Sequence, residues 1–272
     1  MKGKLYLVAT PIGNLGDFSP RARDVLESVD LVACEDTRTS RGLFSLLGVQ
    51  VKATTAYHDF NEEKAAESLI QKLQKGMDIA LVSDAGMPLI SDPGYRLVKA
   101  CHENNIPVTS VPGANAVLTA LQLSGLPTDK FYFGGFLPPK SSARQHALQA
   151  MENLPATLVF YETARRLKEA LTDIEKVLGN RPMAVVRELT KKFEEVKTGT
   201  PAELNAYYSE APKGEIVLVI SGAEERKTKA PNISIKELRK NLSAKDAAFV
   251  WALLTGKPKK EAYHEVLDVD KL

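Results

Sequence analysis

The pattern Ser-Asp-x-Gly occurs twice in a short stretch of the chain, at 83–86 and again at 91–94. The first copy follows an apolar run that predicts a buried strand, and open α/β sheets bind ligands at the carboxyl ends of their strands. We therefore expect a ligand site there. We interpret the second copy as the start of a helix, with Asp92 as N-cap and Pro93 at the first helical position.

Polar residues and glycines also follow the other expected strands, so they collect on one edge of the predicted sheet. The segments are TPIGNLGD (10–17), CEDTRTS (34–40), YHDFNE (57–62) and PGANA (112–116). Glycine in such loops lets backbone amides approach a ligand. Neither G-x-G-x-x-G nor G-x-x-x-x-G-K-[ST] is present, which argues against a standard dinucleotide or nucleoside-triphosphate site and leaves a nucleoside ligand open.

The elements that must position these loops form an α/β pattern in the first half of the chain. Continuous apolar runs alternate with helical patterns and predict a mostly parallel sheet covered on both faces. Ser19 and Pro20 predict one helix start, and the apolar spacing over 61–76 predicts another helix. The runs expected to be strands are 4–10, 30–36, 78–84 and 108–112.

The second half predicts a second α/β domain with a mixed sheet. Gly, Pro and Ser cluster over 123–142, which marks a boundary. The three residues between strands 183–189 and 193–199 imply an antiparallel hairpin. The other expected elements are strands at 157–162 and 215–222 and helices at 165–179 and 201–211. The predicted domains are 1–124, 125–225 and a helical extension, 226–272.

The extension contains a helix-turn-helix-like pair over 244–267, with Lys257, Lys259 and Lys260 crowded at the start of its last helix. These lysines either contact phosphate or form a solvated charged face. The formal net charge of +2 over 272 residues means that any nucleic-acid contact must come from such local clusters.

Cysteine usage and hydropathy bear on the compartment. Cys34 and Cys101 lie in apolar runs at no metal-ligand spacing, so we expect two buried, reduced thiols. No apolar run approaches the roughly 18 residues that a membrane span needs, and the N-terminus has no charged leader followed by a long apolar segment. We therefore expect a cytoplasmic protein without a membrane partner.

Nine ordered segments resemble one known family. They are TPIGNLGD, EDTRTS, HDFNE, LVSDAGMPLISDPG, VPGANAVLTALQLSGLP, GGFLPPK, FYE, RELTKKFEE and KGEIVLVISG, which together span roughly 4–222. The chain resembles the small-subunit ribosomal RNA methyltransferase I family, which belongs to the tetrapyrrole-methylase-type (class III) S-adenosylmethionine enzymes. Three departures from the family pattern, Met87, Ala114 and the segment ETARRL, bear on the shape of the pocket and on a loop expected to face RNA.

The resemblance implies a fold and a reaction. It implies two α/β domains with S-adenosyl-L-methionine in the cleft between them, and a homodimer. The implied reaction is 2′-O-methylation of a decoding-region cytidine in the 16S rRNA of the 30S subunit. Methyl transfer from a sulfonium requires no metal, whereas the ribose hydroxyl needs a proton acceptor.

The resemblance and the residue chemistry together give candidate site residues. The cofactor residues are Pro11, Ser83, Asp84, Ala85, Gly86, Pro112, Gly113, Tyr161, Glu188, Lys213 and Gly214. The catalytic candidates are Glu35, Asp36, His58, Arg187, Glu188 and Lys191. The RNA-binding candidates are Arg38, Arg41, Lys140 and Arg165.

Structural roles compete with several of these assignments. Asp36 could cap the next helix, and Asn61 more simply caps the helix that follows it. His58 is better explained as a structural histidine than as the base. Arg38, Arg41 and Lys140 are equally well explained as solvated side chains. Two other functions also stay open: a tetrapyrrole methyltransferase of the same fold, and a non-catalytic ribosome-binding factor that keeps the cleft only as architecture.

Overall fold

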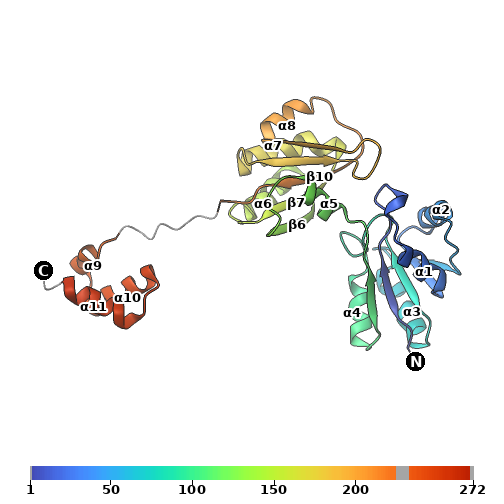
Figure 1. Ribbon diagram of the computed structural model, residues 1–272, viewed down its shortest axis with the longest axis horizontal. Helices are drawn as coiled ribbons and strands as arrows, with labels where there is room; N and C mark the ends of the chain where they lie inside the picture. The colour runs from blue at the N-terminus through green and yellow to red at the C-terminus, as the bar shows by residue number, and fades with distance from the viewer. Residues whose placement is uncertain (1, 225–232, 270–272) are drawn as a thin grey trace. The chain divides into compact units, whose positions relative to one another are not determined.

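The computed structural model describes residues 2–224 and 233–269, which fall into two compact units, Met1–Ala223 and Glu224–Leu272 (Figure 1). The first unit contains two five-stranded sheets, and the second contains helices. The predicted boundary after residue 124 falls between helix α5 (Ala116–Leu123) and strand β6 (Phe131–Phe136). The predicted boundary between 225 and 226 lies outside the described residues.

The first sheet is entirely parallel, with strand order β3-β2-β4-β1-β5, which confirms the predicted parallel sheet. Its register places Leu5 beside Ile79 and Val108. A short strand precedes the polar segment 57–62. The strands are β1 (Leu5–Val8), β2 (Leu31–Cys34), β3 (Thr54–Ala56), β4 (Ile79–Val82) and β5 (Val108–Val111).

Helices cover both faces of this sheet, which explains why its strands are continuously apolar. Alternate strand residues point to opposite faces. Leu5 and Ile79 therefore pack against α3 (Glu62–Gln74) and α4 (Tyr95–Glu103). Val8 and Val82 pack on the other face, against α1 (Pro20–Ser28) and α2 (Thr37–Leu47).

The start of α1 is as predicted, whereas the predicted start of α4 is wrong. The Ser19 hydroxyl accepts a hydrogen bond from the Ala22 amide, and Pro20 is the first helical residue. Helix α4 begins at Tyr95 with Gly94 as its N-cap, so Asp92 and Pro93 precede the cap. The Glu62 carboxylate from α3 accepts the Gly94 and Arg96 amides at 3.2 and 3.4 Å. A side chain from another helix thus replaces the local cap.

The second sheet is mixed, with strand order β6-β7-β10-β8-β9. Strand β6 runs parallel to β7, and the remaining pairs are antiparallel, including the predicted hairpin β8-β9. Helix α8 (Pro201–Tyr207) ends earlier than the predicted 211. The other strands are β7 (Thr157–Thr163), β8 (Met183–Arg187), β9 (Glu195–Gly199) and β10 (Glu215–Ile220).

Helix α5 packs against one face of this second sheet, beside β7 and β10 (Figure 1). Helices α6 (Ser141–Ala150), α7 (Leu167–Leu178) and α8 pack on the other face. Two short 3-10 helices complete the unit, η1 (Leu15–Asp17) and η2 (Ala164–Arg166).

The second unit is helical where it is described, in agreement with the prediction. It consists of α9 (Ile235–Asn241), α10 (Ala244–Thr255) and α11 (Lys259–Val269), which pack around Leu238, Ala248 and Val266. Residues 226–232 and 270–272 of the predicted extension lie outside the described residues.

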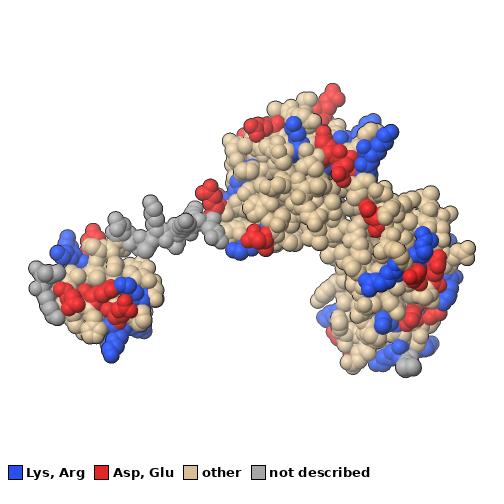
Figure 2. All heavy atoms as spheres, in the orientation of Figure 1, with Lys and Arg blue, Asp and Glu red and all other residues tan. Residues whose placement is uncertain are grey.

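The surface charge, the hydropathy of the helices and the state of the cysteines are as the composition suggests. Basic and acidic side chains are interspersed over the visible surface (Figure 2). No helix within residues 2–224 and 233–269 is both long and apolar enough to cross a membrane. Both cysteine thiols are buried and free, as predicted, and burial raises the pKa of each to about 11.

We predict that Glu62→Ala lowers the free energy of unfolding by about 1–3 kcal/mol, because it leaves the two amides at the start of α4 without their acceptor. Glu63→Ala is the matched control, since Glu63 is exposed in the same turn of α3. Urea denaturation of both variants measures the difference. Equal stability of the two would show that Glu62 does not hold the start of α4.

Candidate functional site

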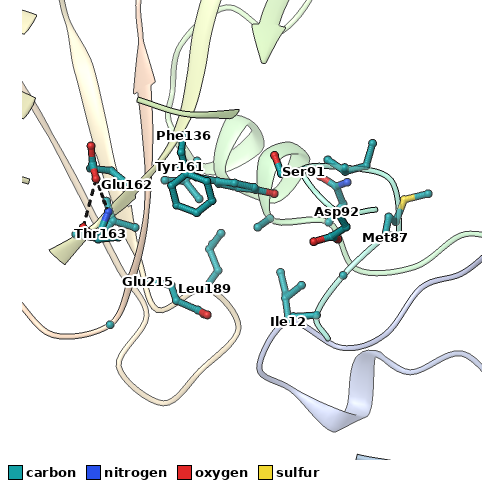
Figure 3. Close-up of a pocket in the computed structure, with 18 of the residues that line it drawn as sticks. Ile12, Met87, Ser91, Asp92, Phe136, Tyr161, Glu162, Thr163, Leu189 and Glu215 are labelled. Atoms are coloured by element: carbon teal, nitrogen blue, oxygen red, sulfur yellow. Dashed lines mark hydrogen bonds between the residues drawn. The ribbon is translucent and has the colours of Figure 1, made fainter. Parts of the chain in front are cut away.

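A cavity of about 330 Å³ lies between the two sheets of the first unit (Figure 3). One wall comes from loops that follow β1, β4 and β5 at the carboxyl edge of the parallel sheet. The other wall comes from β6, β7 and β10 and the loops beside them. The residues that line the cavity include Ile12, Ala85, Gly86, Ser91, Asp92, Phe136, Tyr161, Gly214 and Glu215.

Two backbone hydrogen bonds hold the loops after β1 and β4 together. The Thr10 amide donates to the Gly86 carbonyl at 2.9 Å, and the Gly86 amide donates to the Thr10 carbonyl at 3.1 Å. Gly86 has φ +83°, and an added Cβ would lie 3.2 Å from Ile12 Cγ2. The first Ser-Asp-x-Gly is therefore a fixed turn, and its Ala85 and Gly86 line the cavity.

The opposite wall is aromatic. The Tyr161 ring packs against Phe133 at 5.0 Å and against Phe136 at 5.4 Å between centroids. Burial, together with the negative charges of Asp92 and Glu215, raises the pKa of Tyr161 to about 12. Tyr161 therefore stays a neutral phenol that can donate a hydrogen bond while its ring offers a flat apolar surface.

Asp92 brings a carboxylate into the cavity opposite this wall. Its side chain and that of Tyr161 point toward one another (Figure 3). Burial is the main cause that raises the pKa of Asp92 to about 6. The negative charges of Glu35, Asp84 and Asp59 contribute to this rise, and the Ser83 hydroxyl opposes it. Asp92 has no ion-pair partner among the residues that the structure describes. The group can therefore exchange a proton near neutral pH.

Sequence reasoning missed Asp92 because it was assigned to the helix cap. The signal was present, since Ser91 to Gly94 repeats the pattern of the first turn. What the sequence did not indicate is that Glu62, 30 residues upstream of Asp92, takes over the capping role.

The predicted cofactor residues divide between the cavity and its surroundings. Ala85, Gly86, Tyr161 and Gly214 line the cavity. The other residues of the set do not line it. Pro11 and Ser83 are buried, whereas Pro112, Gly113 and Lys213 are exposed. The Asp84 carboxylate accepts the Asp36 amide at 3.3 Å. Glu188 forms an ion pair with Lys191.

The predicted catalytic cluster of Arg187, Glu188 and Lys191 is brought together, but as ion pairs outside the cavity lining. Lys191 Nζ lies 2.9 Å from Glu188 Oε1 and 2.8 Å from Glu215 Oε2. Arg187 binds Glu195 and donates to the Lys213 carbonyl. Burial lowers the pKa of Lys191, but the hydrogen bonds with Glu215 and Glu188 outweigh it and raise the pKa overall. Lys191 therefore stays protonated and holds the loop that carries Gly214.

The other predicted catalytic residues surround the turn at Asp84. Asp36 is the N-cap of α2, since its carboxylate accepts the Arg38 amide at 2.8 Å. Hydrogen bonds from Arg38 lower the pKa of Asp36, so it is a weak base. Burial raises the pKa of the Glu35 carboxyl. His58 Nδ1 is buried without a hydrogen-bond partner among the described residues.

The side chain of Asn61 does not cap α3 as expected. Its Oδ1 accepts the His58 amide at 2.9 Å, and no side-chain hydrogen bond caps the helix. The bond is to a residue before the helix, so Asn61 fixes the turn into α3 rather than the helix end.

The four predicted RNA-binding residues come from three segments of the chain, with two of them on α2. Arg38 pairs with Asp36, and Arg41 donates two hydrogen bonds to Thr54 Oγ1. Lys140 precedes α6, and Arg165 lies in η2, both exposed.

Comparisons with known proteins agree with the geometry. Residues 4–205 match the family model described as Tetrapyrrole (Corrin/Porphyrin) Methylases. The chain is 47% identical over 270 residues to "Ribosomal RNA small subunit methyltransferase I" of Mesorhizobium japonicum, covering 97% of this chain and 92% of that protein. Identity to the protein of the same name from Escherichia coli is 44%, with 98% and 96% covered.

Solved structures with low sequence identity share the fold. A uroporphyrin-III-C-methyltransferase from Thermus thermophilus has a TM-score of 0.55 at 22% identity, covering 80% of this chain and 94% of that one. A diphthine synthase has a TM-score of 0.63 at 13% identity, with 80% and 89% covered.

We predict that Gly214→Ala destabilises the protein more than Gly125→Ala. Both glycines have positive φ, +99° and +71°, so both variants strain the backbone, but only at 214 would the new Cβ fall on the Glu188 carboxylate. We expect an additional loss of about 1–3 kcal/mol for Gly214→Ala, the usual range for overpacking. Chemical denaturation measures it. Equal losses would mean that the loop is not packed on Glu188.

Proposed function

The chain belongs to the ribosomal RNA small subunit methyltransferase I family, and from that premise we propose that it transfers the methyl group of S-adenosylmethionine to a ribose 2′-oxygen of small-subunit ribosomal RNA. The observation that carries the proposal is near-full-length identity of 44–47% to relatives of that name. Within it, we propose that the acceptor is a cytidine of the decoding region in the 30S subunit, and that a homodimer acts in the cytoplasm. The family resemblance supports these finer points.

The cavity fits the methyl donor by size and by chemistry. Tyr161 and Phe136 offer a flat apolar surface for an adenine ring, and the Ala85–Gly86 turn presents backbone at close range. Asp92 and Glu215 place negative charge beside a cationic ligand. The donor, when bound, supplies an activated sulfonium methyl group. Gly86 is needed because the turn at positive φ lies against Ile12.

The residues of the chain must orient the ribose and remove its proton. A ribose hydroxyl is a poor nucleophile until a base accepts its proton, and a base works best when its pKa lies near the operating pH. Asp92 meets both requirements, since it faces the cavity and has a pKa of about 6. We propose that an Asp92 carboxylate oxygen accepts the proton of the ribose hydroxyl, and that the Tyr161 hydroxyl across the cavity donates a hydrogen bond. Lys191 positions the loop at Gly214 and Glu215 rather than reacting.

We predict that the purified protein transfers a labelled methyl group from S-adenosylmethionine to undermethylated small ribosomal subunits, with the label on a single ribose 2′-oxygen after nuclease mapping. Label on a porphyrin-type acceptor instead would favour the tetrapyrrole methyltransferase. A lack of thermal stabilisation by saturating donor would favour the non-catalytic factor, because a ligand that binds the native state must raise its stability.

We predict that Asp92→Asn lowers kcat by about 10²–10⁴-fold, the usual contribution of a general base, and also weakens donor binding, because it removes a negative charge beside the cationic donor. In the wild type, kcat should fall as the pH drops through about 6, because protonation removes the base. Asp59→Asn is the control. It removes one charge that raises the Asp92 pKa, so it should keep the plateau and move the acid limb to lower pH. Full activity of Asp92→Asn would refute the assignment.

The same carboxylate has an expected effect on stability. The pKa of Asp92 is raised from 3.8 to about 6 on folding. Below pH 3.8, Asp92 is protonated in both the folded and the unfolded state, and its contribution to stability is fully present. This contribution is lost as the pH rises through about 6, because the folded protein must then hold a buried, ionised carboxylate. We predict that Asp92→Asn melts at a higher temperature than wild type at pH above 7 and that the gap closes in acid. A lower melting temperature at high pH would contradict the assigned burial of this charge.

A further inference from the structure

A groove on the helical second unit combines lysines with aromatic rings. It is lined by Lys245, Ala248, Phe249, Lys259, Lys260 and Tyr263, here called the lysine–aromatic groove. Lys245 and Phe249 lie one turn apart on α10, and Lys259 and Tyr263 lie one turn apart on α11. Residues four apart occupy the same face of a helix, so the two helices present matching Lys-aromatic pairs to the groove.

The aromatic rings of this groove are open to solvent. Phe249 is 49% exposed and Tyr263 is 40% exposed, and neither belongs to the hydrophobic core of this unit. Lys259 Nζ lies 5.0 Å from the Phe249 ring centroid, within cation–π distance. Large exposed rings flanked by cations are typical of surfaces that stack bases and bind phosphates.

Several acidic side chains in the described part of this unit bond to residues outside the groove lining. Glu237 and Asp246 accept hydrogen bonds from the hydroxyls of Ser234 and Ser243, the N-cap residues of α9 and α10. Glu265 binds Lys257, and Glu261 lies 3.9 Å from the same lysine.

Three lysines of the groove stay unpaired. Lys245, Lys259 and Lys260 form no ion pair with any residue in the described ranges 2–224 and 233–269. The lining itself contains no acidic residue. The charge pattern is therefore complementary to a polyanion.

We propose that the lysine–aromatic groove binds a single-stranded segment of the ribosomal RNA substrate, with bases stacked on Phe249 and Tyr263 and phosphates beside the three lysines. The inference rests on the proposed function for the identity of the RNA. The groove belongs to a compact unit separate from the one that holds the methyl-transfer cavity. Substrate docking and chemistry are thus assigned to different parts of one chain.

The charge component is tested with Lys259→Gln/Lys260→Gln in the full chain. Lys236→Gln/Lys240→Gln is the matched control, because it removes the same charge from exposed positions of α9 outside the groove. Affinity for undermethylated small subunits and for a single-stranded RNA oligonucleotide is measured between about 50 and 200 mM salt. We expect the groove variant to flatten the log–log salt dependence by about 1.4, the value for two lost phosphate contacts on a single strand. The control should match wild type.

The stacking component is tested with Phe249→Ala against Leu253→Ala. Leu253 is exposed on the same helix one turn farther along and does not line the groove. We expect Phe249→Ala to weaken RNA binding by about 5- to 140-fold, the range that corresponds to one lost base stack. Leu253→Ala should bind as wild type does. In methyl transfer, the groove variants should raise KM for subunits and leave kcat and donor affinity unchanged.

Unchanged affinity, salt slope and KM in both groove variants would overturn the proposal. So would a fall in kcat at saturating subunits, since that would place the groove in chemistry rather than docking. If wild-type protein binds RNA through the groove but transfers no methyl group, the proposed function fails while RNA docking stands. If the wild type captures a protein partner that Phe249→Ala does not capture, and the wild type binds no RNA, the occupant of the groove is a protein and not RNA.

Discussion

The hydrogen bonds from the amides of Gly94 and Arg96 to the Glu62 carboxylate are the interaction on which the candidate site depends. Helix α4 must satisfy its first amides, and the nearest local acceptor in the sequence is Asp92. Because Glu62 supplies the acceptor from α3, Asp92 precedes the helix and turns into the cavity. The Tyr57 hydroxyl also donates to Glu62, at 3.0 Å, which fixes the rotamer of the capping carboxylate.

The loop that carries Asp92 stores strain that the surrounding structure must offset. Leu89 and Ser91 both adopt positive φ, at 72° and 69°, a conformation that side chains with a Cβ rarely adopt. Glu35 and Asp84 add negative charge beside Asp92. Strained backbone and like charges destabilise a folded chain and persist mainly where function requires them. The paired loops at Thr10 and Gly86 give this segment the rigid support it needs.

Much of the fold was accessible from the sequence because its signals are local. Continuous apolar runs identified four of the five parallel strands but not β3, which is short and only partly buried. Ser19-Pro20 identified the start of α1. The short link before Phe193 identified the hairpin β8-β9. The turn at Ala85 and Gly86 follows from a strand end, and it does line the cavity.

The parts that the sequence did not indicate depend on contacts distant in the chain. Asp92 reads as a helix cap until Glu62 is placed beside α4. Lys191 and Glu188 read as catalytic until Glu215, on another strand, is seen to complete an ion-pair cluster. The lysine cluster at the start of α11 was evident from the sequence. Its proximity to the Phe249 ring was not, because that depends on α10 packing alongside α11.

Proton transfer to Asp92 requires that this carboxyl titrates above the ordinary range of an aspartate. The most direct measurement is an NMR titration of the protein labelled with ¹³C at its aspartate carboxyl carbons, with Asp92→Asn used to assign the resonance. We expect the resonance missing from Asp92→Asn to titrate with a midpoint near 6. A midpoint near 3.8 for that resonance would rule out Asp92 as the base, because it would then be a solvated carboxylate.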